Sequence, residues 1–129
     1  MHLASKLRRR LANEESGFTL IELLVVLVII GILLAIAVPS YLGFKDRANK
    51  SAAKANVRAA LPAIEAYYSD HGTYVGTSIA NLKASYDAGL SISTLPVLTA
   101  STYCLTATLG GFTAHRTGPG GAITLTGAC

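Results

Sequence analysis

The sequence has few of the residues from which active sites and metal sites are usually built. Its 129 residues include two cysteines, three histidines and seven acidic residues. His2, His71 and His115 are scattered, and two cysteines without a nearby histidine pair cannot supply the usual four ligands of zinc. No motif groups a nucleophile with a base in the manner of a hydrolase. We therefore expect no catalytic residues, no metal and no cofactor.

Charge is also scarce, and its placement matters more than its total. The formal net charge is +4, and the dense basic cluster "KLRRR" occupies residues 6–10. A nucleic-acid-binding protein usually gathers basic residues on a folded face. This cluster instead precedes a long apolar segment, where it is typical of a membrane topology signal. A direct, specific nucleic-acid ligand is therefore not expected.

Apolar residues are abundant, at 51% of the chain, and they concentrate in residues 18–38. Residues 23–38 carry no polar side chain, and the apolar segment begins at Phe18 with Thr19 and Glu22 inside it. About 20 such residues span a bilayer as a helix. The upstream basic residues place the N-terminus in the cytoplasm and export the rest. In an oxidising compartment, Cys104 and Cys129 are expected to form a disulfide.

Two other interpretations of this segment remain open. A secretory signal peptide would have a basic region, an apolar region and a cleavage site such as "AIA" at residues 35–37. Against it, Glu14, Glu15 and Glu22 lie between the basic residues and the apolar core, and the apolar segment exceeds the usual length. A buried core helix would need a larger surrounding domain than the remaining residues can form.

The stretch "SGFTLIELLVVLVIIGILLAIAVPSY" resembles the N-terminus of type IV prepilins and of the pseudopilins of type II secretion. The matching features are Gly17 before Phe18, the sequence of residues 19–22 ending in Glu22, and the aliphatic run with Pro39 near its end. The resemblance implies that a prepilin peptidase removes residues 1–17, cutting between Gly17 and Phe18, and methylates the new Phe18 amine.

The resemblance also implies assembly into a filament, with Thr19, Glu22 and Pro39 as assembly residues. A charge at membrane depth costs on the order of 2.5–3.5 kcal/mol unless it finds a partner. Cleavage creates an amine at Phe18, four residues before Glu22 and on the same helical face. In a filament, the Phe18 amine of a neighbouring copy can neutralise Glu22 and select an axial register, while aliphatic helix surfaces supply most of the cohesion.

The implied partners are copies of the chain, related minor pilins, the peptidase, an inner-membrane assembly platform, and the membrane before assembly. The precursor is expected in the inner or cytoplasmic membrane, with its head exported. The assembled protein is expected in an extracellular pilus or a periplasm-spanning pseudopilus. A calcium site like that of major pseudopilins would use Asp70 and Asp87, but the acidic residues there are too sparse for six or more oxygen ligands.

Beyond the transmembrane or filament-core helix at 18–38, residues 39–70 read as an amphipathic helix. Val57, Leu61, Ile64 and Tyr68 follow one another at helical spacing and predict its buried face. Basic residues, including the i+4 series Lys50, Lys54 and Arg58, fall largely away from that face. Two prolines, Pro39 and Pro62, are expected to interrupt the helix.

Residues 71–129 predict a small antiparallel β-sheet head with a connecting loop, and the whole chain an α+β, pilin-like fold. A short helical turn is expected near residues 79–84. The alternating "TYCLTATL" predicts a strand, followed by "FTAHRT" and "AITLTGAC" in a meander with glycine-rich turns. The "GPGG" at 118–121 lacks the helix and lysine of a phosphate-binding loop, which favours a turn.

Together these features favour a structural subunit of a type IV pilus. Two alternatives remain: a pseudopilin of a type II secretion system, and a monomeric binding domain anchored by a single span. The sequence does not separate adhesion, motility and DNA uptake as roles of the filament.

Overall fold

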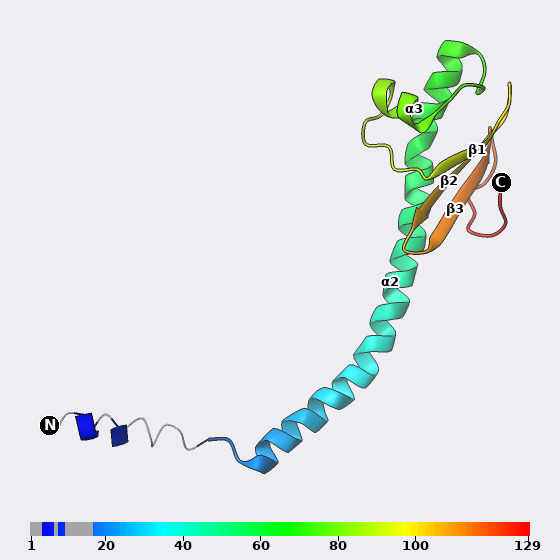
Figure 1. The fold of residues 1–129 in the computed structure, drawn as a ribbon. Coiled ribbons are helices and arrows are strands. Elements are labelled where there is room, and N and C mark those ends of the chain that lie inside the picture. The colour runs from blue at the N-terminus through cyan, green and yellow to red at the C-terminus, as the bar shows by residue number, and fades with distance from the viewer. Residues whose placement is uncertain (1–3, 7, 10–16) are drawn as a thin grey trace. The chain divides into compact units, whose positions relative to one another are not determined.

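The computed structural model describes residues 4–6, 8–9 and 17–129 (Figure 1). The elements, in chain order, are α2 (Leu20–His71), α3 (Ile79–Ser85), β1 (Thr94–Leu98), β2 (Tyr103–Leu109) and β3 (Phe112–Gly118). A long helix followed by a three-stranded antiparallel sheet confirms the predicted α+β class. Most of the predicted leader, residues 1–17, lies outside the described residues.

The chain divides into two compact units, Met1–Tyr41 and Leu42–Cys129, and α2 contributes residues to both. In the first unit, every α2 residue is exposed. This is the one helix among the described residues that is long and apolar enough to cross a membrane. A helix that is apolar all round needs lipid or other protein to cover it. The length and composition of this helix thus agree with a membrane span at residues 18–38. That span stays a prediction.

The expected interruption at the prolines is wrong, because α2 continues through both Pro39 and Pro62. Each proline removes one amide donor from the helical hydrogen-bond series. Near Pro39, the Ser40 hydroxyl donates to the Ile36 carbonyl at 3.2 Å. Both prolines are exposed, so their rings do not compete with core packing. The helix tolerates the missing bonds without ending.

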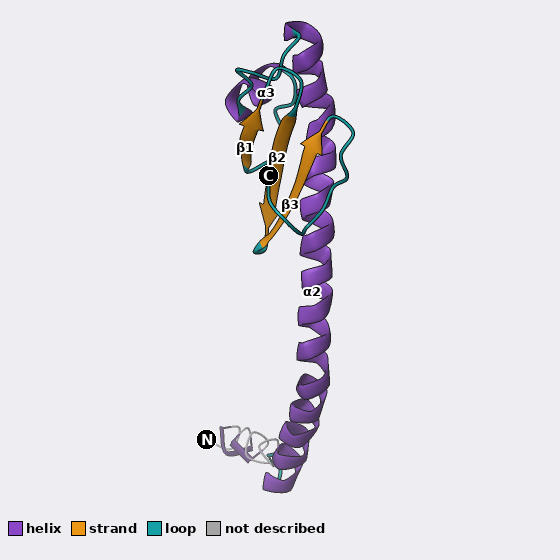
Figure 2. Cartoon of the chain, turned by 90° about the vertical axis from the view of Figure 1, so that its right-hand side faces the viewer, coloured by secondary structure: helices purple, strands orange, loops and turns teal. Residues whose placement is uncertain are grey.

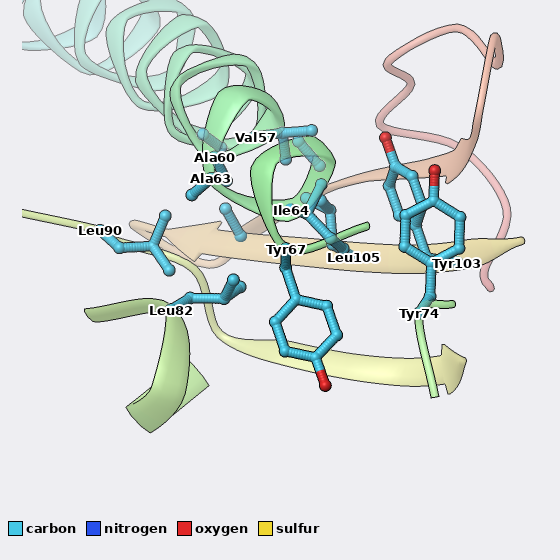
Figure 3. Packing of buried hydrophobic residues seen from close by; sticks show 13 residues of the cluster. Val57, Ala60, Ala63, Ile64, Tyr67, Tyr74, Leu82, Leu90, Tyr103 and Leu105 are labelled. Atoms are coloured by element: carbon cyan, nitrogen blue, oxygen red, sulfur yellow. The ribbon is translucent and has the colours of Figure 1, made fainter. Parts of the chain in front are cut away.

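The core of the second unit lies between one face of α2 and the sheet (Figure 3). The buried α2 residues are Ala53, Val57, Ala60, Ala63, Ile64 and Tyr67. The predicted face is therefore right at Val57 and Ile64. It is wrong at Leu61, which is half-buried, and at Tyr68, which is 36% exposed. The small alanine side chains let the sheet approach closely, so Ala53, Ala60 and Ala63 share the buried face with the larger buried residues.

The sheet has the order β1-β2-β3 with antiparallel neighbours, and it lies beside the second part of α2 (Figure 2). Both β2 and β3 occur where the sequence predicts them, joined by a turn at Gly110 and Gly111. Along β2, Tyr103, Cys104, Leu105 and Ala107 are buried, whereas Leu109 at the end of the strand is exposed.

The third strand is β1 rather than the predicted C-terminal segment. Residues 122–129 form one isolated bridge, between Thr124 and His115. Pro96 disfavours a strand at 94–98, because proline cannot donate to a β-ladder. The structure accommodates Pro96 because β1 is an edge strand whose register shifts between Thr94 and Val97.

The predicted disulfide and the short helix are confirmed. Cys104 of β2 is bonded to Cys129, with their Cα atoms 5.8 Å apart. The bond ties the C-terminal segment to the central strand of the sheet. Ser78 caps α3, since its side chain accepts a hydrogen bond from the Asn81 amide at 3.1 Å.

Candidate functional site

The start of α2 is organised by two reciprocal hydrogen bonds between Thr19 and Glu22. The Thr19 amide donates to Oε2 of Glu22 at 3.0 Å, and the Glu22 amide donates to the Thr19 hydroxyl oxygen at 3.2 Å. This arrangement is a capping box, which satisfies two amides that a helix N-terminus would otherwise leave unpaired. The carboxylate also lies in the first helical turn, where the helix dipole favours negative charge.

Gly17 and Phe18 lie immediately outside this cap, in backbone without regular secondary structure. Both are exposed, and 90% of the Phe18 surface is accessible. Within the described residues, the peptide bond between them is therefore not protected by helical hydrogen bonds or by packing. A peptidase could reach it without unwinding α2.

Next to the cap, a groove of about 440 Å³ is lined by Phe18, Glu22, Leu23 and Val26. Three of these side chains are apolar and one is a carboxylate. Such a groove can receive an apolar group that carries a positive charge at one end. In the part of the chain that the structure describes, Oε1 of Glu22 accepts no hydrogen bond, so one carboxylate oxygen remains for such a ligand.

The structure brings together some of the predicted assembly residues and separates others. Thr19 and Glu22 are bonded partners, and Phe18 shares the groove with Glu22. Pro39 lies 20 residues after Thr19 on α2, about 30 Å further along the helix at 1.5 Å per residue. It is therefore not part of the same site.

Sequence reasoning missed two tyrosine–carboxylate pairs in the second unit. The Tyr74 hydroxyl donates to the Glu65 carboxylate, at 3.1 Å from both oxygens, and the Tyr86 hydroxyl donates to Oδ2 of Asp70 at 2.6 Å. Burial, with help from the Glu65 hydrogen bond, raises the pKa of Tyr74 to about 12. The hydrogen bond to Asp70, followed by desolvation, raises the pKa of Tyr86 to about 12. No sequence pattern links residues this far apart.

A third tyrosine lies against the first pair. The rings of Tyr74 and Tyr103 are 4.8 Å apart between centroids, and Figure 3 shows both side chains at the same end of the core. Burial raises the pKa of Tyr103, an effect that the nearby Arg116 opposes. These phenols therefore remain protonated at neutral pH.

The residues weighed as calcium ligands have other contacts. Asp70 accepts from Tyr86, and Oδ1 of Asp87 accepts from the Gly89 amide at 2.9 Å. Within the described residues, no three His, Cys, Asp or Glu side chains gather closely enough to hold a metal ion.

The N-terminal segment matches a known protein family. The profile of the family described as "Prokaryotic N-terminal methylation motif" matches residues 13–38. Over 97 residues, which cover 74% of both chains, the sequence is 34% identical to the type IV wide pilus major component of Thermus thermophilus.

Two further relatives match over 65 residues, half of this chain. The type IV major pilin protein of Myxococcus xanthus is 47% identical over 30% of its own length. The type II secretion system core protein G of Pseudomonas aeruginosa is 42% identical over 46% of its length. The matched segment thus spans less than half of these two proteins, in contrast to the Thermus protein.

Proposed function

Because this chain belongs to the family of type IV pilins and type II secretion pseudopilins, we propose that it is a structural subunit of a type IV pilus. Its relatives are filament subunits rather than enzymes. The observation that carries the proposal is the exposed Gly17–Phe18 junction, which lies directly ahead of the Thr19–Glu22 cap and of the exposed apolar part of α2.

The proposed first step is removal of residues 1–17 by a membrane-embedded prepilin peptidase, with methylation of the Phe18 amine. The capping box supports this step because it starts the helix at Leu20 and leaves the Gly17–Phe18 bond outside it. Hydrolysis of that bond removes the basic leader residues 6–10 and creates a positive amine beside the groove.

The proposed second step is pairing of that amine with Glu22 of a neighbouring copy. The capping box occupies Oε2 of Glu22 and leaves Oε1 available for the incoming amine. The apolar Phe18 side chain next to that amine matches the apolar lining of the groove. A charge-assisted hydrogen bond is about twice as strong as a neutral one. Pairing therefore offsets the cost of holding Glu22 at membrane depth.

Cohesion of the proposed filament comes from the apolar surface of α2. Its large side chains from Leu20 to Phe44 are each between 46% and 86% exposed. Each ångström squared of apolar surface removed from water contributes about 25 cal/mol. In lipid the driving force is packing instead, which suits a subunit that waits in the membrane and leaves it on assembly. An inner-membrane platform would drive that transfer.

A pseudopilin of a type II secretion system is the second candidate, supported by the similarity to core protein G. The pilus is favoured because the match to a wide pilus major component extends over 74% of both chains. A monomeric membrane-anchored domain would leave the Glu22 groove without a ligand.

Mass spectrometry of the N-terminus tests the proposal. The mature protein is expected to have 112 residues (129 minus 17) and to begin with an N-methylated Phe18. An intact Met1 start would exclude processing and leave the anchored monomer. Imaging cells with and without the gene separates the filament types: loss of surface filaments supports a pilus, whereas loss of protein secretion with surface filaments retained supports a pseudopilus.

A further inference from the structure

The second unit separates positive and negative charge along α2. Residues 45–58 contain five basic residues, Lys45, Arg47, Lys50, Lys54 and Arg58, and one acidic residue, Asp46. The last part of the helix carries two carboxylates, Glu65 and Asp70, and no lysine or arginine. Arg58, Glu65 and Asp70 are exposed, and Lys54 is half-buried.

Among the residues that the structure describes, these basic residues have no acidic partner. In the described part of the chain, no carboxylate lies within 4.0 Å of the cationic group of Lys54 or Arg58. Lys50 has a different contact, with its ammonium 4.9 Å from the centroid of the Phe112 ring. Lys54 and Arg58, spaced four residues apart, therefore present a charged face that the fold of one chain does not neutralise.

The two carboxylates are held in place, but by neutral groups. Glu65 accepts from the Tyr74 hydroxyl and Asp70 accepts from the Tyr86 hydroxyl. A phenol that stays protonated orients a carboxylate without cancelling its charge. Both carboxylates are thus fixed negative charges at exposed positions of α2.

Helix geometry places Glu65 and Arg58 on the same face. Seven residues separate them, close to two turns of 3.6 residues, so Glu65 lies about 10 Å further along the axis on the Arg58 side. A parallel copy displaced by that distance brings its Arg58 level with Glu65 of the first. Asp70, twelve residues after Arg58, lies about 120° around the helix from it and therefore belongs to another face.

We propose that the Lys54–Arg58 face of α2 docks on Glu65 of a second copy of this chain. The inference rests on the proposed filament. It adds a contact between subunits that sets how far one copy is displaced along the axis relative to the next. Matched charges on one helix favour a copy of the chain over a nucleic acid, which would need basic residues over a wider surface.

Charge reversal and exchange in the full-length protein, expressed in its host, test this contact. Arg58→Glu and Glu65→Lys each place like charges opposite one another, and each is expected to reduce the filaments recovered by shearing at least about tenfold. The double variant, Arg58→Glu with Glu65→Lys, restores opposite charges and is expected to recover most of the wild-type yield. Lys83→Glu, on the exposed surface of α3, is the control and is expected to assemble normally.

Two outcomes would overturn the contact. Single variants that assemble like the wild type would show that these charges do not meet. A double variant as defective as the singles would point to another ligand for Arg58, such as a nucleic acid or an anionic lipid.

Two milder variants test the contact even if charge reversal prevents folding. Arg58→Gln and Glu65→Gln remove charge without reversing it, and the amide oxygen that Glu65→Gln introduces can still accept from Tyr74. Each is expected to assemble with a smaller loss and with less sensitivity to salt than the wild type; salt sensitivity equal to the wild type would also overturn the contact. Wild-type cells that process the chain but make no filament would instead refute the proposed function.

Discussion

The side chain of Glu22 and the backbone of Thr19 are joined within one helical turn, with the Thr19 amide 3.0 Å from Oε2 of Glu22. The Thr19 hydroxyl completes the exchange by accepting from the Glu22 amide. Glu22 therefore has a structural role in a single chain, before any filament exists. This role explains how a carboxylate can be held at the edge of an apolar helix while keeping one oxygen for a neighbouring amine.

The observed helix face makes a prediction about stability. Ile64→Ala removes a fully buried side chain and is expected to lower the free energy of unfolding by about 2–5 kcal/mol. Tyr68→Ala changes a side chain that is 36% exposed and is expected to cost clearly less. Thermal unfolding of the detergent-solubilised proteins, followed by circular dichroism, measures both. Equal losses would support the face that periodicity predicts instead.

The disulfide gives a second prediction. The variant Cys104→Ser with Cys129→Ser opens a bond between residues 25 apart and is expected to lose about 3 kcal/mol, on the chain-entropy estimate. Urea unfolding with and without a reductant measures the loss. The reductant should destabilise the wild type and leave the double variant unchanged. A wild type insensitive to reduction, despite full reduction of its thiols, would contradict a stabilising role.

The tyrosine–carboxylate pairs predict sensitivity to alkaline pH. The pKa of Tyr74 rises from 10.0 to about 12 on folding, as does that of Tyr86. Their contribution to stability is complete below pH 10, where the phenols are protonated in both states. It is lost as the pH rises towards 12, because the unfolded chain then ionises more readily.

Absorbance of the phenolate form during an alkaline titration measures this effect. The wild type is expected to show a late-titrating component that shrinks in Tyr74→Phe. Identical titrations of the two proteins above pH 10, scaled for the missing phenol, would contradict the assigned hydrogen bond to Glu65.

Local patterns in the sequence were sufficient to predict most of the fold. The alternation in 103–109 predicts β2, and an exported pair of cysteines predicts the bond between Cys104 and Cys129. The buried face of α2 was partly missed because three of its six residues are alanines, which carry little hydrophobic signal. The edge strand β1 was missed because Pro96 argues against a strand unless the edge position is already known.

At the candidate site, the assembly role of Thr19 and Glu22 stays a prediction, and the hydrogen bonds that join them were not predicted. Thr19 and Glu22 have the S/T-x-x-E spacing of a capping box, so this signal was present in the sequence. The contacts of Tyr74 with Glu65 and of Tyr86 with Asp70 join residues 9 and 16 positions apart. They depend on how the connecting loop folds back on α2, which local patterns do not encode.

The most direct test of the central claim is filament assembly by Glu22→Gln. Glutamine at this position can keep the capping box but has no charge to pair with a neighbouring amine. Thr19→Ala is the matched control: it removes the hydroxyl acceptor, at a cost of about 1 kcal/mol to the helix start, and retains the charge.

Electron microscopy of sheared surface filaments, with immunoblotting of the processed subunit, measures assembly. If the charge of Glu22 drives assembly, Glu22→Gln is processed but forms few or no filaments, and Thr19→Ala forms them with a modest loss. Normal filaments from Glu22→Gln would contradict the account and leave Glu22 with a capping role alone.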